Sequence, residues 1–411
     1  MSKKNFIFPG IFVFILLSAS LFLGLFLNED ASGVGTSNDF KNTLPYINAL
    51  KDNLIIDGSE WTRLLPLHFL FISFLFYFTD NVFLIRLIFC AISLLVPYLF
   101  YLNLKLKFNS INRDNLLILS STILLLPFFR SSAIWPNPHV LSLIFVLLSI
   151  YFFNKWEKNL SKKIDYTFLL HLIFLSLAVY TRRYYVFFFI YYFINYLKIL
   201  NFKNLIYTFL IISLFSIPGF LLIFKFPYYL TSSGYNFKYF NTFLISASIF
   251  LFFVIPFLKP SNFQNLKKRD LVFQIVLAFL ITFLASIFFD YNPRNGGGIF
   301  IKISNIFFGG NLFFFLTSFL GFFVLIGLIK EKKYNLYLIL IVFILFSNNY
   351  MYQKYLEPLW LILFFLVMNS KIFSDFIKSQ KQIFLVLSYF ILYYAAAISN
   401  SVFKISLNHF W

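Results

Sequence analysis

Long apolar runs separated by short polar segments are the dominant pattern along this chain of 411 residues. The first run, from Phe6 to Leu27, contains no charged residue. At about 1.5 Å of rise per residue, a helix of that length can cross a hydrocarbon core of about 30 Å. A secretory signal has a shorter apolar region followed by a small-residue cleavage site. We therefore interpret this run as a retained membrane span.

The same pattern continues along the chain and predicts an all-α polytopic membrane protein, with residues 1–411 forming one transmembrane domain. A further apolar stretch, from Leu64 to Thr79, is predicted to lie in the membrane interface as an amphipathic helix. Residues 28–81 would then form an outer loop that carries interfacial helices. The thirteen candidate spans are residues 6–27, 82–103, 116–129, 138–153, 166–181, 184–200, 205–224, 241–258, 271–289, 312–329, 335–347, 357–370 and 382–399.

Basic residues indicate the orientation, because Lys and Arg are enriched on the cytoplasmic side of membrane proteins. With a cytoplasmic N-terminus and an interfacial 64–79 stretch, the cytoplasmic segments hold 21 of the 34 Lys and Arg residues. If the stretch spanned the membrane, every later loop would change sides and this enrichment would be reversed. We therefore expect a multi-pass protein of the bacterial inner membrane, with its C-terminus outside.

Composition agrees with this interpretation. Charged residues make up 12% of the chain, about half the share of roughly 25% that is typical of soluble domains. The formal charge is +19, but the basic residues lie in short loops between apolar runs, so we attribute the charge to topology and expect no nucleic-acid partner. A single cysteine, Cys90, excludes an intrachain disulfide.

Carboxylates are concentrated in the first predicted outer segment, which includes Glu29, Asp30 and Asp39 among six acidic residues. A carboxylate near a membrane surface can act as a general base or coordinate a metal ion. An ordinary solvated loop is the alternative interpretation.

Cations on the predicted outer side need an explanation because they oppose the usual charge distribution. Arg182 and Arg183 lie at the outer end of a predicted span, where an anionic ligand or a solvated helix end would explain them. Arg63 precedes the apolar stretch that contains His68, and it could bind a lipid phosphate or act as a snorkelling anchor. Lys354, beside Tyr355, is another outer cation.

Three common motifs of catalytic sites are missing from the sequence. The histidines have no metal-ligand spacing, there is no Gly-x-Ser-x-Gly or His-Glu-x-x-His motif, and Gly296–Gly298 lacks the Gly-Lys-Ser/Thr ending of a P-loop. Asn137 and His139 belong to a Trp-Pro-Asn-Pro-His turn that two prolines restrict. Outer carboxylates with several outer cations suit a lipid-phosphate-linked substrate better than a hydrolytic site.

Five stretches, taken in order, carry a resemblance to a known family. They are Glu29-Asp30 or Asn38-Asp39-Phe40; Thr62 to His68 leading through Phe78-Thr79-Asp80 to Leu84–Leu87; Ser131 to Ser149 with Asn137-Pro138; Leu177 to Tyr184; and Lys354 to Pro358. This order resembles the polyprenyl-phosphate-dependent glycosyltransferases of the GT-C class, especially the branch of protein O-mannosyltransferases and lipid A aminoarabinose transferases. The sequence departs from the family pattern at Thr62, where some members carry an acid, and at Asn137, which replaces an Asp.

The resemblance implies a GT-C-like fold and transfer of a sugar from a polyprenyl-phosphate donor to a lipid, glycan or protein acceptor, with inversion. It makes Asp39 the leading candidate base, followed by Glu29 and Asp30. No organic cofactor is implied, and a divalent metal requirement stays open. Residues implied in binding the lipid phosphate or the sugar are Arg63, His68, Asn137, His139, Arg182, Arg183, Lys354 and Tyr355.

Two other functions remain open at this point. A polysaccharide polymerase or ligase would be expected to have a large late outer loop, whereas the segment 290–311 is of modest length. A transporter or flippase for lipid-linked glycans would be expected to have inverted repeats and charges near the middle of the membrane.

Overall fold

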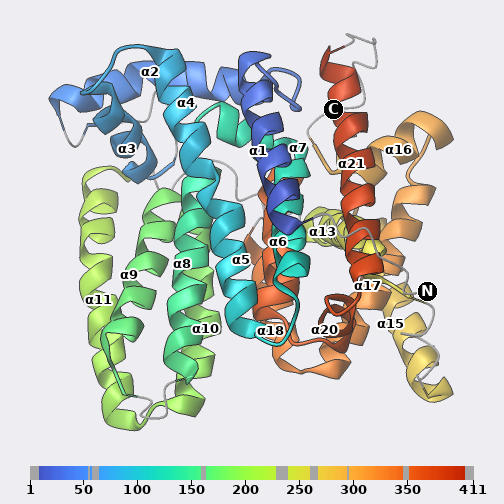
Figure 1. The fold of residues 1–411 in the computed structure, drawn as a ribbon. Helices are drawn as coiled ribbons and strands as arrows, with labels where there is room; N and C mark the ends of the chain where they lie inside the picture. Colours follow the sequence, from blue (N-terminus) through green and yellow to red (C-terminus); the bar gives the residue numbers. More distant parts are fainter. Residues whose placement is uncertain are drawn as a thin grey trace, which may run out of the picture.

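Helices form all the regular structure in the part of the chain that the computed structural model describes, which is residues 9–53, 56–57, 64–158, 163–227, 239–259, 267–293, 296–345 and 351–402 (Figure 1). In chain order the α-helices are α1 (Gly10–Phe26), α2 (Gly35–Asp52), α3 (Leu67–Phe76), α4 (Val82–Ser93), α5 (Leu95–Lys107), α6 (Arg113–Ser121), α7 (Pro127–Ile134), α8 (Pro138–Lys158), α9 (Tyr166–Thr181), α10 (Val186–Ile199), α11 (Phe202–Lys225), α13 (Tyr239–Val254), α15 (Lys268–Ile287), α16 (Ile299–Phe308), α17 (Leu312–Glu331), α18 (Tyr334–Leu345), α19 (Glu357–Ile362), α20 (Lys371–Phe376) and α21 (Gln380–Val402). Short 3₁₀ turns are η1 (Thr122–Leu125), η2 (Arg183–Tyr185), η3 (Ile255–Phe257) and η5 (Gln353–Tyr355).

Seven of the described helices are long and apolar enough to cross a membrane. A helix of 20 residues is about 30 Å long, which matches the hydrocarbon core of a bilayer. The all-α class is therefore confirmed, and the fold is that expected of a membrane protein, while the count of thirteen spans stays a prediction. The seven helices are Val82–Lys107, Pro138–Lys158, Phe202–Lys225, Tyr239–Phe257, Lys268–Ile287, Leu312–Glu331 and Gln380–Ser399.

The predicted span over residues 116–129 is not one straight helix. The helical stretch Arg113–Leu125 ends before Pro127, and the chain bends by 71° into α7. Leu126 has an extended ψ of 115°, as expected for a residue that precedes proline. Because α7 continues to Ile134, part of the predicted loop after residue 129 is also helical. Likewise, the segment 290–311 contains α16.

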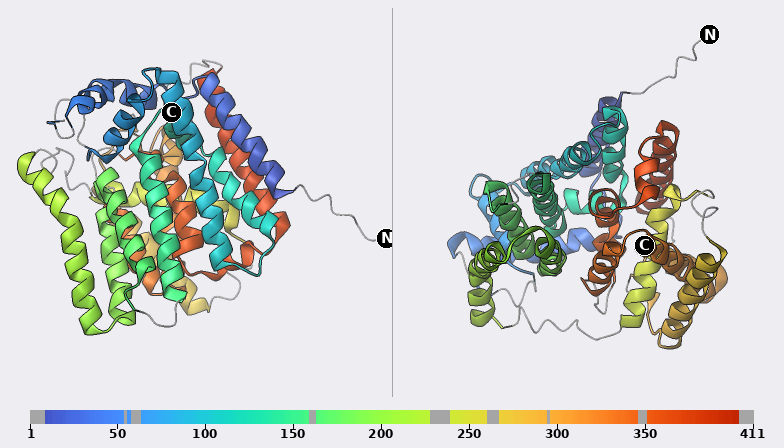
Figure 2. Two further views of the ribbon diagram at one scale, coloured as in Figure 1. Left: turned by 60° about the vertical axis from the view of Figure 1, so that its left-hand side comes forward. Right: turned by 90° about the horizontal axis from the view of Figure 1, so that it is seen from below.

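The long helices run between two ends of the molecule (Figure 1). Helices α2 and α3 lie at one end, which we call the α2 end, and α20 lies near the other, which we call the α20 end. Helices α8 to α11 form one side, and α15, α17 and α21 lie on the other (Figures 1 and 2). The packing on that second side is close, because Gly321 of α17 lies where a Cβ would overlap the backbone of Ala247 in α13.

Side chains in the sequence account for where several helices begin. The side-chain oxygens of Asn81, Asn112, Asp165 and Asn201 accept backbone N–H groups in the first turns of α4, α6, α9 and α11. An N-cap of this kind satisfies a donor that the helix leaves unpaired and stabilises it by about 1 kcal/mol. These polar residues therefore determine where the apolar runs start as helices.

Candidate functional site

A cavity of about 370 Å³ lies at the α2 end, where segments from distant parts of the sequence meet. Three of the predicted site residues, Asp39, Lys354 and Tyr355, line it together. Asp39 comes from α2, and the other two come from η5, more than 300 positions later. The full lining is Ser32, Gly35, Asp39, Phe128, Gly296, Gly298, Ile299, Lys302, Tyr352, Gln353, Lys354 and Tyr355.

An ion pair joins the two sides of this cavity. The Lys354 Nζ lies 3.2 Å from Asp39 Oδ2, and the side chains are 17% and 57% exposed. The Lys354 ammonium also lies 5.2 Å from the ring centroid of Tyr352 and 5.9 Å from that of Tyr355. An ion pair this open contributes about 0–1 kcal/mol. An incoming anion can therefore displace the carboxylate from Lys354 at small cost.

Arg182 lies behind Tyr355 and is only 7% exposed. Its guanidinium carbon is 4.9 Å from the Tyr355 ring centroid, and one terminal nitrogen donates to His139 Nδ1 over 2.9 Å. Among the described residues its Nε has no hydrogen-bond partner, and no carboxylate lies within 4 Å of it. A buried cation without a counter-charge is costly, so this position favours an anion.

The two histidines beside Arg182 are neutral, for different reasons. Because a guanidinium can only donate, His139 Nδ1 accepts the bond and the proton is on Nε2. That buried Nε2–H has no partner among the described residues, and so it resembles the Arg182 Nε–H. For His68, burial lowers the pKa from 6.5 to about 3, with Arg182 lowering it further and a hydrogen bond to the Pro136 backbone opposing both. The Arg182 Nε–H and the His139 Nε2–H are therefore two buried donors that lie beside one buried positive charge.

Glu29 lies apart from the cavity lining and is committed to Arg130. Arg130 Nε and a terminal nitrogen donate to the two Glu29 carboxylate oxygens over 2.8 and 2.7 Å. The remaining Arg130 donors reach Ser20 and the Leu124 carbonyl, and Tyr394 donates to Glu29 over 3.1 Å. Both charged side chains are almost fully buried, so this predicted catalytic acid is held in protein contacts.

Asp30, the other acid that follows α1, binds its own loop. It accepts hydrogen bonds from the backbone and hydroxyl of Ser32 and from the backbone N–H of Ser37, which tie the chain into the start of α2. Asp39 is therefore the one of the three predicted acids that reaches the cavity.

The remaining predicted residues are placed as follows. Asn137 accepts the backbone N–H of His139 over 3.1 Å at the start of α8. Arg183 lies in η2 with its guanidinium carbon 5.9 Å from the Tyr184 ring centroid, outside the cavity lining. Arg63 lies outside the described residues.

Lys302 and Gln353 line the cavity but were not predicted as site residues. Burial lowers the pKa of Lys302 from 10.5 to about 8. Gln353 accepts the backbone N–H of Ile299 over 3.0 Å and donates to the Tyr393 hydroxyl over 2.8 Å. Lys302 is a cation in a predicted outer segment, and this is the signal by which Lys354 was identified. The same signal could have identified Lys302.

Three glycines before α16 form the wall that carries Lys302. Gly296, Gly297 and Gly298 all have positive φ, from 84° to 112°, which side chains rarely adopt. The Gly297 N–H donates to the Met351 carbonyl over 2.7 Å, and a Cβ on Gly298 would lie 2.7 Å from Ile249. The predicted glycine-rich loop is thus packed tightly between α13 and η5.

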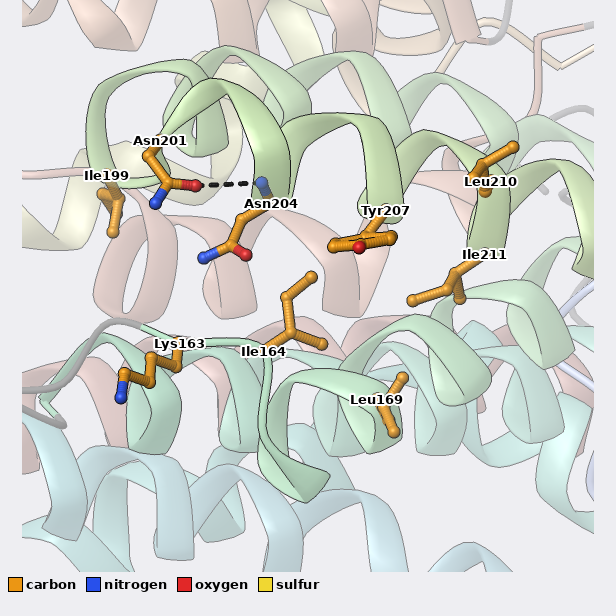
Figure 3. Close-up of a pocket in the computed structure, with 9 residues that line it drawn as sticks. All are labelled: Lys163, Ile164, Leu169, Ile199, Asn201, Asn204, Tyr207, Leu210 and Ile211. Carbon is orange, nitrogen blue, oxygen red and sulfur yellow. Dashed lines mark hydrogen bonds between the residues drawn. The ribbon is translucent and has the colours of Figure 1, made fainter.

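Other cavities contain fewer of the expected groups. A cavity of about 790 Å³ between α9 and α11 is largely apolar, with Lys163 as its one ionisable side chain other than Tyr207 (Figure 3). Another, of about 770 Å³ near α20, has Lys107, Lys259 and Glu331 in its lining. Neither includes a predicted site residue. In the described ranges no three His, Cys, Asp or Glu side chains are grouped as metal ligands.

Comparison of the chain with known protein families, with curated proteins and with solved structures finds no match. The α2-end cavity is therefore interpreted from its own residues.

Proposed function

We propose that this chain is a membrane glycosyltransferase that moves a sugar from a polyprenyl-phosphate donor to an acceptor at the outer face of the membrane. One observation carries the proposal: a carboxylate, Asp39, and an ammonium, Lys354, meet in one cavity at the α2 end. The buried cation Arg182 lies directly behind its wall. The order of sequence motifs that resembles the GT-C class supports the same function.

The proposed orientation places the α2 end outside. Lysines of the predicted cytoplasmic loops, such as Lys107, Lys259 and Lys332, line the cavity near α20 at the opposite end. The donor's lipid would then remain in the bilayer, with its phosphate at the level of the outer headgroups. The phosphate would replace the Asp39 carboxylate as the ion-pair partner of Lys354, and the carboxylate would then be free to accept a hydrogen bond from the acceptor hydroxyl.

The reaction would be one displacement. The acceptor hydroxyl oxygen bonds to the anomeric carbon while the bond from that carbon to the phosphate oxygen breaks. The hydroxyl proton passes to the Asp39 carboxylate, which acts as general base. Polyprenyl phosphate leaves with an additional negative charge, which Lys354 and Arg182 stabilise. A single displacement inverts the anomeric centre.

A transporter of lipid-linked glycans is the second candidate, and the buried pair Glu29–Arg130 is the observation that favours it. Intramembrane charges often mark transport pathways. However, both partners are saturated by hydrogen bonds, and neither lines any of the cavities at the two ends. Their arrangement therefore suits a structural role better than a substrate pathway.

The test is transfer of radiolabelled sugar from a panel of polyprenyl-phosphate sugars by the purified full chain. General acid–base catalysis contributes about 10²–10⁴-fold, so Asp39→Asn should lower transfer by at least about 100-fold. Lys354→Met should also lower it strongly. The matched control is the exposed ion pair of Lys51 and Asp80 in the first predicted outer segment, whose variants Asp80→Asn and Lys51→Met should retain wild-type transfer.

Two results would contradict the proposal. One is an Asp39→Asn variant that transfers sugar as fast as wild type. The other is movement of intact lipid-linked glycan between leaflets without any new glycosidic bond, which would replace the glycosyltransferase with a transporter.

A further inference from the structure

A network of three buried polar side chains begins in the wall of the α2-end cavity. Gln353, which lines the cavity, donates from its Nε2 to the Tyr393 hydroxyl over 2.8 Å. This hydroxyl donates in turn to Glu357 Oε2 over 3.0 Å. The three side chains are at most 5% exposed. Because they belong to η5, α21 and α19, the network joins three elements that are separate in the sequence.

Both ends of this network bind backbone N–H groups of other cavity-lining residues. Gln353 Oε1 accepts the N–H of Ile299, the first residue of α16, and Glu357 Oε1 accepts the N–H of Phe128, each over 3.0 Å. Since a backbone N–H can only donate, Gln353 must turn its oxygen to Ile299 and its NH₂ group to Tyr393. The hydroxyl proton of Tyr393 is then left for Glu357. The network therefore connects the parts of the cavity lining that come from η5, α16 and α7.

One branch of the network has a structural explanation. Phe128 lies in the first turn of α7, where backbone N–H groups have no partner within the helix, so Glu357 caps this helix. The cap accounts for one carboxylate oxygen of Glu357. It does not account for the second branch, which runs through Tyr393 to Gln353 in the cavity wall.

The two walls that Gln353 joins each carry a lysine. Lys354 follows Gln353 in η5, and Lys302 lies about one turn after Ile299 in α16. Both lysines line the cavity. No acidic side chain pairs with Lys302 in the part of the chain that the structure describes. Because the Gln353 amide binds α16 directly and α21 through Tyr393, it restricts the separation of the two lysine-bearing walls.

We propose, resting on the function above, that Gln353, Tyr393 and Glu357 are positioning residues for the donor phosphate. They hold η5 and α16 at the separation at which Lys354 and Lys302 both contact one phosphate group. The three residues act through the two lysines and not by contact with the reacting atoms. Loss of the network would let the walls move relative to each other, and the phosphate would then bind more weakly.

The experiment measures the affinity of undecaprenyl phosphate for the full chain in nanodiscs of a neutral phospholipid, so that neither the sugar nor the acceptor has to be known. Tyr393→Phe removes the hydroxyl that links Gln353 to Glu357 and should weaken binding about tenfold. The matched control is Tyr389→Phe, one turn earlier on α21, which removes a hydrogen bond to the Phe252 carbonyl. Because neither of these two residues lines the cavity, the control should bind as wild type does.

A double-mutant cycle separates positioning from general destabilisation. In a Lys302→Met background the separation of the two walls no longer matters, so adding Tyr393→Phe should change the affinity by less than about twofold. Gln353→Met interrupts the same network from the cavity side and should reproduce the loss of affinity seen in Tyr393→Phe.

Three results would overturn the positioning role: wild-type affinity in a folded Tyr393→Phe variant, an equal loss in Tyr393→Phe and Tyr389→Phe, or an equal effect of Tyr393→Phe with and without Lys302. If binding to the wild type then still requires Lys354, the proposed function stands without this role. If undecaprenyl phosphate does not bind to the folded wild-type chain, the positioning role and the proposed function fail together.

Discussion

The buried pair Glu29–Arg130 should make the junction of α1, α7 and α21 sensitive to the loss of either partner. The two side chains are 5% and 0% exposed, and their carboxylate and guanidinium meet in a bidentate arrangement. The Arg130 guanidinium also lies 4.4 Å from the Tyr394 ring centroid on α21. Removing one partner of such a pair leaves an uncompensated buried charge, which costs about 3–5 kcal/mol.

The perturbation is Glu29→Gln and Arg130→Met, made singly and together. Each single variant should lose about 3–5 kcal/mol of unfolding free energy, while the double variant should lose much less than the sum, because no unpaired charge remains. Reversible unfolding by SDS in mixed micelles measures these free energies. The exposed pair Lys330–Asp270 is the control, and its double-mutant cycle should give about 0–1 kcal/mol.

Losses below about 1 kcal/mol that simply add in the double variant would refute this reasoning, because a pair that costs so little to break is not buried. A further result would reassign Glu29. If Glu29→Gln keeps full stability but loses sugar transfer, then Glu29 acts in catalysis and not in the fold.

Three further predictions concern the α2 end. Burial holds the pKa of His68 at about 3 while the unfolded chain titrates at 6.5, so the unfolded state binds the extra proton below pH 6.5 and stability should fall as pH drops from there towards 3, by up to about 1.4 kcal/mol per unit. Hydrogen-exchange protection factors of α3, which are corrected for the intrinsic exchange rate at each pH, should therefore be lower at pH 5 than at pH 7 in wild type and unchanged in His68→Phe. Gly298→Ala should cost about 1–3 kcal/mol in a thermal unfolding assay, because φ of 84° with ψ of 177° is a region that only glycine readily adopts, whereas Gly310→Ala, with nothing within 4 Å, should have little effect. Lys302 lines the α2-end cavity and burial lowers its pKa to about 8, so the affinity for undecaprenyl phosphate should decrease above about pH 8 in wild type and remain in Lys302→Arg; an identical pH profile in the two proteins would contradict a contact between Lys302 and the bound phosphate.

Much of the fold could be predicted from the sequence because hydropathy and helix caps are local signals. Apolar runs of about 20 residues produced the long helices, and residues such as Asn81 and Asp165 mark their starts. The bend after Leu125 was missed because the run of apolar residues continues past it. Pro127 is the local feature that marked the break.

The candidate site was predictable in part. Asp39 and Lys354 were singled out separately, but their contact joins residues 315 positions apart, which one sequence cannot reveal. The ion pair of Glu29 with Arg130 was hidden for the same reason, because it joins residues 101 positions apart. Lys302 was overlooked because the glycines before it were interpreted only as a loop, whereas their positive φ values build a wall of the cavity.

The most direct test of the central claim is a cryo-EM map of the full chain in nanodiscs with bound undecaprenyl phosphate, using a rigid antibody fragment to aid alignment. The account predicts phosphate density at the α2 end within hydrogen-bond distance of Lys354, with the ion pair to Asp39 broken and the lipid extending into the bilayer. Phosphate density in the cavity near α20, beside Lys107 and Lys259, with the Asp39–Lys354 pair intact would contradict it.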